Sequence, residues 1–322
     1  MVEERHPLRQ RRLNKANARN VGLMVQLNGL LQKGIGGFYY VEAADTVYEC
    51  RARGIFRKRR QAPLVGDKVR ITVDEAGREN TIDEILPRKN FLRRPPLANL
   101  EQLILVASSC EPSPNLFLLD KLTAIAVSKQ IAPVMVFTKT DLCNADAFIG
   151  IYRQAGIPAF SVSCKTGEGV EAFRPILAGK LSAFTGNSGV GKSSLLNCLD
   201  ASLRLPTGEI SDKLGRGRHT TRQSEIFHLA GGLVADTPGF SSLDLEKSEV
   251  LRKEELPFCF PEFLPYLGQC RFSSCTHTRD RGCAILRAVE AGKIGRQRHE
   301  SYVSLYEEAK SVKEWELDER GR

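Results

Sequence analysis

The sequence predicts a multi-domain chain with three structured parts: a small N-terminal β-barrel, a central doubly wound α/β domain, and a mostly helical C-terminal module that binds a metal ion. Three observations support this division. Short β-like segments separated by glycines fill residues 22–85. Apolar strand-like segments then alternate with helical ones up to about residue 245. Three cysteines and a histidine cluster within residues 270–283.

Composition and two prolines set the expected boundaries. We assign residues 1–20 to a basic disordered tail, 21–95 to the barrel, 96–245 to the α/β domain and 246–322 to the metal-binding module. The second boundary lies at Pro95-Pro96, because consecutive prolines interrupt regular structure. The chain lacks an apolar run of roughly 18 residues, the length that crosses a bilayer. Its charged N-terminus has no apolar signal-peptide core, so we expect a cytoplasmic protein without a membrane partner.

The predicted barrel has about five short strands, which suits an OB-fold, although an SH3-like barrel would give a similar pattern. The clearest strand segments are residues 22–27, 38–42, 46–51 and 67–73. One of the aromatic residues Phe38, Tyr39 and Tyr40 is expected in the barrel core, and the others could stack on bases.

Positive charge is concentrated at the N-terminal end. Residues 1–60 hold 13 Lys and Arg against 5 Asp and Glu, whereas the net charge of the whole chain is +9. Arg51, Arg53 and the basic residues 57–60 lie near one strand and the loop after it. This distribution favours a nucleic-acid partner, and the alternative is a basic segment that only aids solubility.

The central domain is predicted from continuous apolar runs, which are typical of buried parallel strands. Residues 103–107 form the first such run. Further strands are expected at residues 134–137, 159–162, 180–185 and 233–235, and helices at 117–130 and 193–199.

A phosphate-binding loop follows one of these strands. Residues 186–193 read GNSGVGKS and fit the pattern G-x-x-x-x-G-K-S. Glycines let backbone N–H groups surround phosphate oxygens, and the following helix adds its positive N-terminal end. We expect Lys192 to reach the β- and γ-phosphates and Ser193 to ligate Mg²⁺. The predicted contact residues are Gly186, Asn187, Ser188, Gly189, Val190, Gly191, Lys192, Ser193 and Ser194.

A base-recognition motif lies upstream, at Thr138-Lys139-Thr140-Asp141. The Asp141 carboxylate can accept hydrogen bonds from guanine N1–H and the exocyclic amine, an arrangement that adenine does not offer. A carboxylate left unpaired would cost about 1–3 kcal/mol, so the motif predicts GTP and GDP as ligands rather than ATP. Lys139 would lie along the base plane, and an ordinary strand end is the alternative interpretation. Ser163-Cys164-Lys165 resembles the box whose backbone contacts guanine O6.

Two further segments complete the predicted site. Asp236 and Gly239 belong to a DTPG box, in which the carboxylate holds the Mg²⁺ shell through water and the glycine N–H meets the γ-phosphate. Phe240 follows where related enzymes have a water-orienting glutamine, so we expect slow intrinsic hydrolysis. Residues 215–221 read GRGRHTT and are expected to form switch I. Thr221 is favoured over Thr220 as the Mg²⁺ ligand, and His219 is the catalytic candidate, with a contact to RNA phosphate as the alternative.

The cysteine–histidine cluster predicts one structural Zn²⁺. Cys270, Cys275, His277 and Cys283 supply three thiols and an imidazole, which suit tetrahedral coordination and leave no position for a substrate. The alternative is a group of free thiols. The other six cysteines are scattered, and we expect them to be reduced and buried. An apolar stripe of Tyr302, Leu305, Tyr306 and Ala309 is expected to pack on this module.

The order of the motifs is rotated, because the base-recognition motif precedes the phosphate loop. Together with the β domain before them and the metal cluster after them, these motifs resemble the RsgA family of circularly permuted GTPases. The resemblance covers residues 22–314, and the GRGRHTT and DTPGF segments are specific to it.

The resemblance implies a function in late maturation of the small (30S) ribosomal subunit. It implies binding to that subunit and its 16S rRNA, GTP hydrolysis that the subunit stimulates, and His219 as the proposed catalytic residue. Nothing in the sequence requires a dimer, so we expect a monomer. The alternatives are a permuted GTPase of the large subunit, and an RNA-binding protein that the nucleotide only stabilises.

Overall fold

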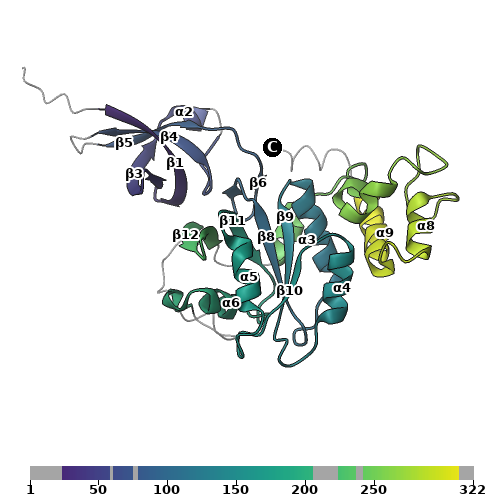
Figure 1. Ribbon diagram of the computed structural model, residues 1–322. Coiled ribbons are helices and arrows are strands. Elements are labelled where there is room, and N and C mark those ends of the chain that lie inside the picture. Colours follow the sequence, from purple (N-terminus) through teal and green to yellow (C-terminus); the bar gives the residue numbers. More distant parts are fainter. Residues whose placement is uncertain (1–23, 59–60, 75–78, 206–223, 237–241, 312–322) are drawn as a thin grey trace, which may run out of the picture. The chain divides into compact units, whose positions relative to one another are not determined.

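The computed structural model describes residues 24–58, 61–74, 79–205, 224–236 and 242–311 (Figure 1). The predicted tail, the switch I segment with His219, Thr220 and Thr221, and Gly239 lie outside these residues. The chain forms two compact units. Residues up to 63 together with 67–87 form the first unit, and residues 64–66 together with those from 88 onward form the second. The four domain ranges given above stay predictions.

The first unit is the predicted barrel. Its strands are β1 (Met24–Ile35), β2 (Phe38–Ala43), β3 (Thr46–Ala52), β4 (Lys68–Asp74) and β5 (Asn80–Ile85), with the short helix α2 (Ile55–Lys58) after β3. Strand β1 pairs with both β2 and β4, and β3 runs parallel to β5. The pairs β2–β3 and β4–β5 close the ring in the order β1-β2-β3-β5-β4, which confirms a five-stranded barrel of OB-fold type.

The expectation that an aromatic residue of β2 fills the barrel core is wrong. Phe38, Tyr39 and Tyr40 are all partly exposed, whereas Val41 is fully buried. Strand alternation gives Tyr39 and Val41 the same face, but Tyr39 lies near the hairpin end, where its ring covers Gly34. Smaller aliphatic side chains fill the interior instead, among them Leu31, Val69, Ile71 and Ile82.

The second unit contains the predicted α/β domain. Its strands are β8 (Gln102–Ser108), β9 (Ala132–Thr138), β10 (Ala159–Ser161), β11 (Leu181–Thr185), β12 (Glu225–Leu229) and β13 (Gly232–Asp236). They lie in the order β10-β9-β8-β11-β13-β12, and only β12, which the sequence analysis missed, runs antiparallel to its neighbour. A short hairpin of β6 (Phe91–Leu92) and β7 (Leu97–Ala98) precedes this sheet.

Helices α3 (Leu116–Ser128), α4 (Asp146–Gln154), α5 (Val170–Phe173) and α6 (Lys192–Leu199) alternate with the parallel strands (Figure 1). Two short 3-10 helices, η1 (Arg174–Leu177) and η2 (Ala201–Leu203), follow α5 and α6. Apolar residues of the strands and helices form one buried core, which includes Ile104, Val136, Phe173, Phe184 and Leu195. The parallel strands end at one edge of the sheet, so the loops after β8, β9, β10, β11 and β13 share that edge.

The C-terminal part contains helices without a strand among its described residues, 242–311. The elements are α7 (Ser242–Ser248), η3 (Leu256–Cys259), η4 (Pro261–Tyr266), α8 (Ala284–Glu290) and α9 (Arg296–Ser311). In the predicted stripe of α9, Tyr302 and Leu305 are buried, and Tyr306 and Ala309 are partly exposed. The Tyr302 hydroxyl donates to the Thr276 carbonyl at 2.8 Å, so the stripe contacts the cysteine–histidine segment as expected.

Among the helices of the described residues, none is long and apolar enough to cross a membrane.

Candidate nucleotide site and metal centre

The phosphate loop joins the end of β11 to the start of α6. A Cβ atom on Gly186 would lie 2.3 Å from the Val106 carbonyl oxygen, so the close approach of β8 requires glycine there. Gly191 has a φ of +95° immediately before the helix, which also favours glycine. The Lys192 ammonium donates to the carbonyls of Gly186 at 2.5 Å and Asn187 at 2.9 Å. This lysine is therefore folded over the loop in which phosphates would bind.

The base-recognition motif meets the phosphate loop directly. Thr138 is the last residue of β9, and its hydroxyl donates to the Val190 carbonyl, 52 residues further along the chain. A Cβ on Gly191 would lie 3.4 Å from the same hydroxyl oxygen. The structure thus brings together the two motifs that the chain order separates.

Lys139 and Asp141 are held in different ways. Lys139 has a φ of +59°, and its ammonium donates to the Glu111 carbonyl in the loop after β8. One carboxylate oxygen of Asp141 accepts a hydrogen bond from the Ser163 hydroxyl at 2.8 Å. Ser163 is predicted from the sequence only as part of the box that contacts guanine O6. Its hydrogen bond to Asp141 had no signal in the sequence.

The Ser163-Cys164-Lys165 box is tied to the phosphate-loop helix. Cys198 of α6 donates its thiol hydrogen to the Cys164 carbonyl at 3.5 Å. Burial, followed by the neighbouring Cys198, raises the pKa of the Cys164 thiol to about 12. The thiol of Cys164 therefore stays protonated at neutral pH, as expected for a structural cysteine.

Asp236 ends β13 beside β11. The register pairs Ala183 of β11 with Ala235 of β13, which places the Asp236 carboxylate at the same sheet edge as the phosphate loop. Ser193 and Ser194 lie in the first turn of α6 and are partly exposed. The roles predicted for these residues, and for Thr221 and Gly239 outside the described ranges, stay predictions.

The loop after β8 adds a contact that the sequence analysis missed. In this loop the Glu111 carbonyl accepts the hydrogen bond from Lys139. The Cδ atom of Pro112, in the same loop, lies 3.9 Å from the position that a Cβ atom on Gly189 would take. The loop therefore touches both the base-recognition lysine and the phosphate loop. The sequence offered one indication of this contact: the loop follows a parallel strand, and ligands bind at the sheet edge where such strands end.

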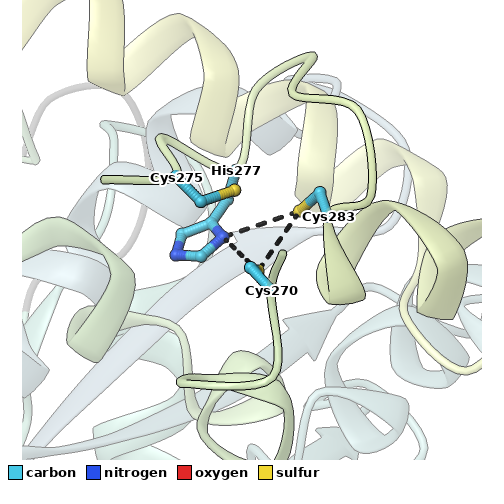
Figure 2. Close-up of side chains that lie close together, drawn as sticks. All are labelled: Cys270, Cys275, His277 and Cys283. Carbon is cyan, nitrogen blue, oxygen red and sulfur yellow. Dashed lines mark hydrogen bonds between the residues drawn. The ribbon is translucent and has the colours of Figure 1, made fainter. Parts of the chain in front are cut away.

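The cysteine–histidine segment forms a compact metal-ligand cluster. All four candidate ligand atoms lie within 4.8 Å of one another. As Figure 2 shows, the Cys270 thiol is 3.5 Å from His277 Nδ1 and 3.9 Å from the Cys283 thiol, which is 3.6 Å from the same nitrogen. Tetrahedral zinc, with bonds of about 2.3 Å to sulfur and about 2.0 Å to nitrogen, sets its ligands about 3.5–3.8 Å apart. These separations fit such an ion.

Backbone and carboxylate contacts support the cluster. The Ala284 N–H donates to the Cys270 sulfur at 3.3 Å, a contact that helps to orient this candidate ligand. Asp280 accepts from the Thr276 N–H at 3.0 Å and from its hydroxyl at 2.6 Å, and these hydrogen bonds lower the pKa of Asp280. His299 of α9 contacts the His277 carbonyl at 2.8 Å. The segment is thus bound by both α8 and α9.

Comparison with known proteins identifies the family. The RsgA GTPase family matches residues 85–246, and the RsgA N-terminal domain matches residues 28–79. The chain is 46% identical over 291 residues to the small ribosomal subunit biogenesis GTPase RsgA of Geobacillus sp. (strain WCH70), covering 88% of this chain and 98% of that protein. The chain belongs to the RsgA GTPase family. A relative of the same name from Moorella thermoacetica is 46% identical over 286 residues, with 88% and 97% covered.

Solved structures agree with this family. The crystal structure of YloQ, a circularly permuted GTPase, matches with a TM-score of 0.75 and 34% identity, covering 90% of this chain and 96% of that one. YjeQ from Thermotoga maritima matches with a TM-score of 0.76 and 33% identity, covering 90% and 100%. The chain is therefore a circularly permuted GTP hydrolase with a nucleotide site, and its Cys₃His cluster is a candidate metal site.

Proposed function

We propose that this chain assists late maturation of the small ribosomal subunit, binds its 16S rRNA, and hydrolyses GTP to GDP and phosphate when the subunit stimulates it. The observation that carries the proposal is the junction of Thr138 with Val190, which unites base and phosphate recognition in one site. The names of its relatives supply the subunit. Such a factor would act as a monomer in the cytoplasm, where ribosomal subunits are assembled.

In this proposal the phosphate loop and α6 hold the nucleotide phosphates. Lys192 leaves the carbonyls of Gly186 and Asn187 for the β- and γ-phosphates, and Ser193 ligates Mg²⁺. Asp236 holds the Mg²⁺ shell through water, Gly239 donates to the γ-phosphate, and Thr221, or alternatively Thr220, completes the Mg²⁺ shell.

Guanine recognition falls to the segment after β9. Asp141 would accept from guanine N1–H and the exocyclic amine, while Ser163 keeps its carboxylate in place. Lys139 would lie along the base, and the backbone after Ser163 would meet O6. Asp141 is exposed in the structure, and a bound base would cover it. Because a covered carboxylate without donors is costly, this arrangement would exclude adenine.

The metal in the Cys₃His cluster is proposed to be one structural Zn²⁺. Four protein ligands at tetrahedral separations leave no position for a water or substrate, so the ion would stabilise the fold of its segment. It would deprotonate the three thiols on binding.

RNA binding is proposed for the barrel and the basic residues around the metal segment. Arg51 pairs with Glu79 at 2.7 Å, and its guanidinium lies 4.6 Å from the centre of the Phe38 ring. Arg53 pairs with Asp83 at 2.9 Å. Because these two arginines already have acidic partners, much of the attraction to phosphate would come from basic residues elsewhere in residues 1–60.

His219 is proposed to position the attacking water, because Phe240 stands where a glutamine would otherwise do so. We expect His219→Ala to lower subunit-stimulated turnover by about 100-fold or more, the usual contribution of a positioned acid–base group. Affinity for GTP should be unchanged, since the histidine would act only on the water. Single-turnover rates with saturating subunits measure this, and an unchanged rate would refute the role.

Turnover measured with and without isolated subunits tests the function as a whole. We expect small subunits to raise the rate of GTP hydrolysis, and large subunits at the same concentration to leave it near the basal rate. Stimulation by large subunits alone would favour the alternative that this GTPase serves the large ribosomal subunit. A flat rate near zero with both would favour a binding protein that the nucleotide only stabilises.

A further inference from the structure

Two cysteines without an assigned role lie on the two loops that flank Lys139. Cys110 follows β8, and Cys143 follows the base-recognition motif. Both loops converge on the Lys139 carbonyl, which accepts from the Ser109 hydroxyl at 3.1 Å and from the Cys143 N–H at 3.4 Å. The two thiols also influence each other's ionisation, as neighbouring groups do. The backbone contacts therefore hold a pair of thiols together beside the predicted guanine site.

The pair is accessible, and its members differ chemically. Cys143 is exposed and Cys110 partly exposed, so the expectation that the scattered cysteines are buried is wrong for this pair. Desolvation opposes ionisation of Cys110, but hydrogen bonds from the Glu111 backbone, Cys143 and Ser108, together with the charge of Lys139, lower its pKa. The hydrogen bond to Cys110 raises the pKa of Cys143. Cys110 is thus the more acidic of the two thiols and the better suited to attack first, and Cys143 is the thiol that would resolve the intermediate.

A second cysteine pair offers a contrast within the same domain. Cys164 and Cys198 also lie close together, but burial raises the pKa of Cys164 to about 12. A thiol with this pKa is almost entirely protonated at neutral pH and reacts slowly. The two pairs therefore differ in that Cys143 is exposed, and in that the pKa of Cys110 is lowered whereas that of Cys164 is raised.

We propose that Cys110 and Cys143 are an oxidisable dithiol whose disulfide clamps the guanine end of the site and slows nucleotide release. The Cys110 thiolate attacks one sulfur of a small-molecule disulfide, forms a mixed disulfide and releases one thiolate. Cys143 loses its proton to solvent and attacks the Cys110 sulfur, which releases the second thiolate. Two protein thiols are oxidised, and one small-molecule disulfide is reduced to two thiols.

We infer that the disulfide would act as a clamp because the two loops contact both parts of the nucleotide site. This step rests on the proposed roles of Lys139 and Asp141. The Cys110 loop accepts from the Lys139 ammonium through Glu111 and lies against the phosphate loop through Pro112. Cys143 lies two residues after Asp141. A covalent link would oppose separation of these loops, so opening of the base site would be less frequent.

Peptide mapping tests the link without any nucleotide. The full chain, purified with its metal, is incubated with oxidised glutathione, alkylated and digested with trypsin without reduction. Cleavage after Lys121, Lys139, Arg153 and Lys165 places Cys110, Cys143 and Cys164 in separate peptides. We expect one linked pair, peptides 94–121 and 140–153, with Cys164 and Cys198 still alkylated; the first peptide begins at Arg94 because trypsin does not cleave before Pro95. Failure to form this link, or equal oxidation of Cys164 and Cys198, would overturn the dithiol.

Dissociation of a fluorescent GDP analogue tests the clamp. We expect oxidation to slow its release by about fivefold or more, within the usual range of coupling energies. Reductant should restore the rate, and Cys110→Ser or Cys143→Ser should abolish the response. A release rate that is unchanged or faster after oxidation would overturn the clamp. Reduced protein that binds no GDP would instead overturn the proposed guanine site, a different failure from the absence of the link.

Discussion

At the scale of single residues, the proposed choice of base depends on one carboxylate and the hydroxyl that donates to it. Ser163 is completely buried, and its hydroxyl donates a hydrogen bond to one carboxylate oxygen of Asp141. This contact fixes the rotation of the carboxylate before the base arrives, so little conformational freedom is lost on binding. Specificity for guanine then depends on the donors that the base presents.

Asp141→Asn should exchange the preferred base. The carbonyl oxygen of an asparagine here can accept from guanine N1–H, but its NH₂ group then faces the exocyclic amine of guanine, so that two donors meet. In xanthine the same NH₂ group can donate to O2. We expect affinity for GDP to fall by about 10–100-fold, from a loss of about 1–3 kcal/mol. Affinity for xanthosine diphosphate should rise, and competition binding with both nucleotides measures the change. Unchanged preference for guanine would contradict the assignment of Asp141.

Arg298 is a fully buried cation, and it joins the C-terminal part to the α/β domain. It donates to Asp120 of α3 and to Glu262 of η4, both at 2.7 Å, and to the Thr123 hydroxyl at 3.0 Å. Its side chain is 1% exposed. Burial opposes its charge, but the two carboxylates raise the pKa of Arg298, so it stays ionised. Removing it would leave two buried carboxylates without their cation.

Arg298→Met should lower the free energy of unfolding by about 3–5 kcal/mol, the usual cost of breaking a buried ion pair. Urea unfolding followed by circular dichroism measures this. Adding Asp120→Asn and Glu262→Gln should recover most of the loss, because no unpaired charge then remains buried. Lys310→Ala is a matched control: its ion pair with Glu307 is exposed at 3.7 Å, so we expect a change below about 0.5 kcal/mol. Equal effects of the two single variants would contradict this account.

At the scale of elements, the sheet edge and the cysteine–histidine segment differ in what holds them. The loops at the sheet edge are anchored by buried parallel strands, so the nucleotide site is held by the core. The cysteine–histidine segment lies between η4 and α8, and Tyr302 and His299 of α9 contact its backbone. Zinc would supply the remaining order to this segment.

Removing zinc should destabilise the C-terminal segment while sparing the barrel. We expect Cys275→Ser, or a strong chelator, to release about one zinc per chain and to increase hydrogen exchange in residues 270–283 and α8, since apo sites of this kind lose their fold. Metal analysis after exhaustive dialysis, with hydrogen exchange, measures both. Cys143→Ser is the control, because its thiol is exposed and lies outside the cluster. A Cys275→Ser protein that retained both zinc and protection would remove the proposed site.

At the scale of the whole molecule, the rotated motif order places the C-terminal part directly after the Asp236–Gly239 box. Lys121 of α3 pairs with Glu246 of α7 at 3.1 Å and with Glu308 of α9 at 2.6 Å. The helix that follows this box, α7, is therefore tied to α3 and, through the same lysine, to α9. If the box responds to the γ-phosphate as proposed, this connection would let the nucleotide state alter the proposed binding to RNA.

We expect small-subunit affinity to be about fivefold or more higher with a non-hydrolysable GTP analogue than with GDP, a typical coupling between two sites. Binding in both states should weaken steeply with salt, because phosphate contacts release counterions. Sedimentation at several salt concentrations with each nucleotide measures both effects. Equal affinity with the two nucleotides would contradict the coupling, and a flat salt dependence would contradict recognition of RNA phosphates.

The sequence by itself determined the barrel, the phosphate loop, the base-recognition motif and the metal cluster, because each depends on the spacing of residues that are close along the chain. Only the tertiary structure decided that Thr138 meets Val190, that Ser163 holds Asp141, that Val41 rather than an aromatic residue fills the barrel, and that Arg298 is buried between two carboxylates. These contacts join residues far apart in the chain, and they depend on strand order and on the burial of charge, which local periodicity does not encode.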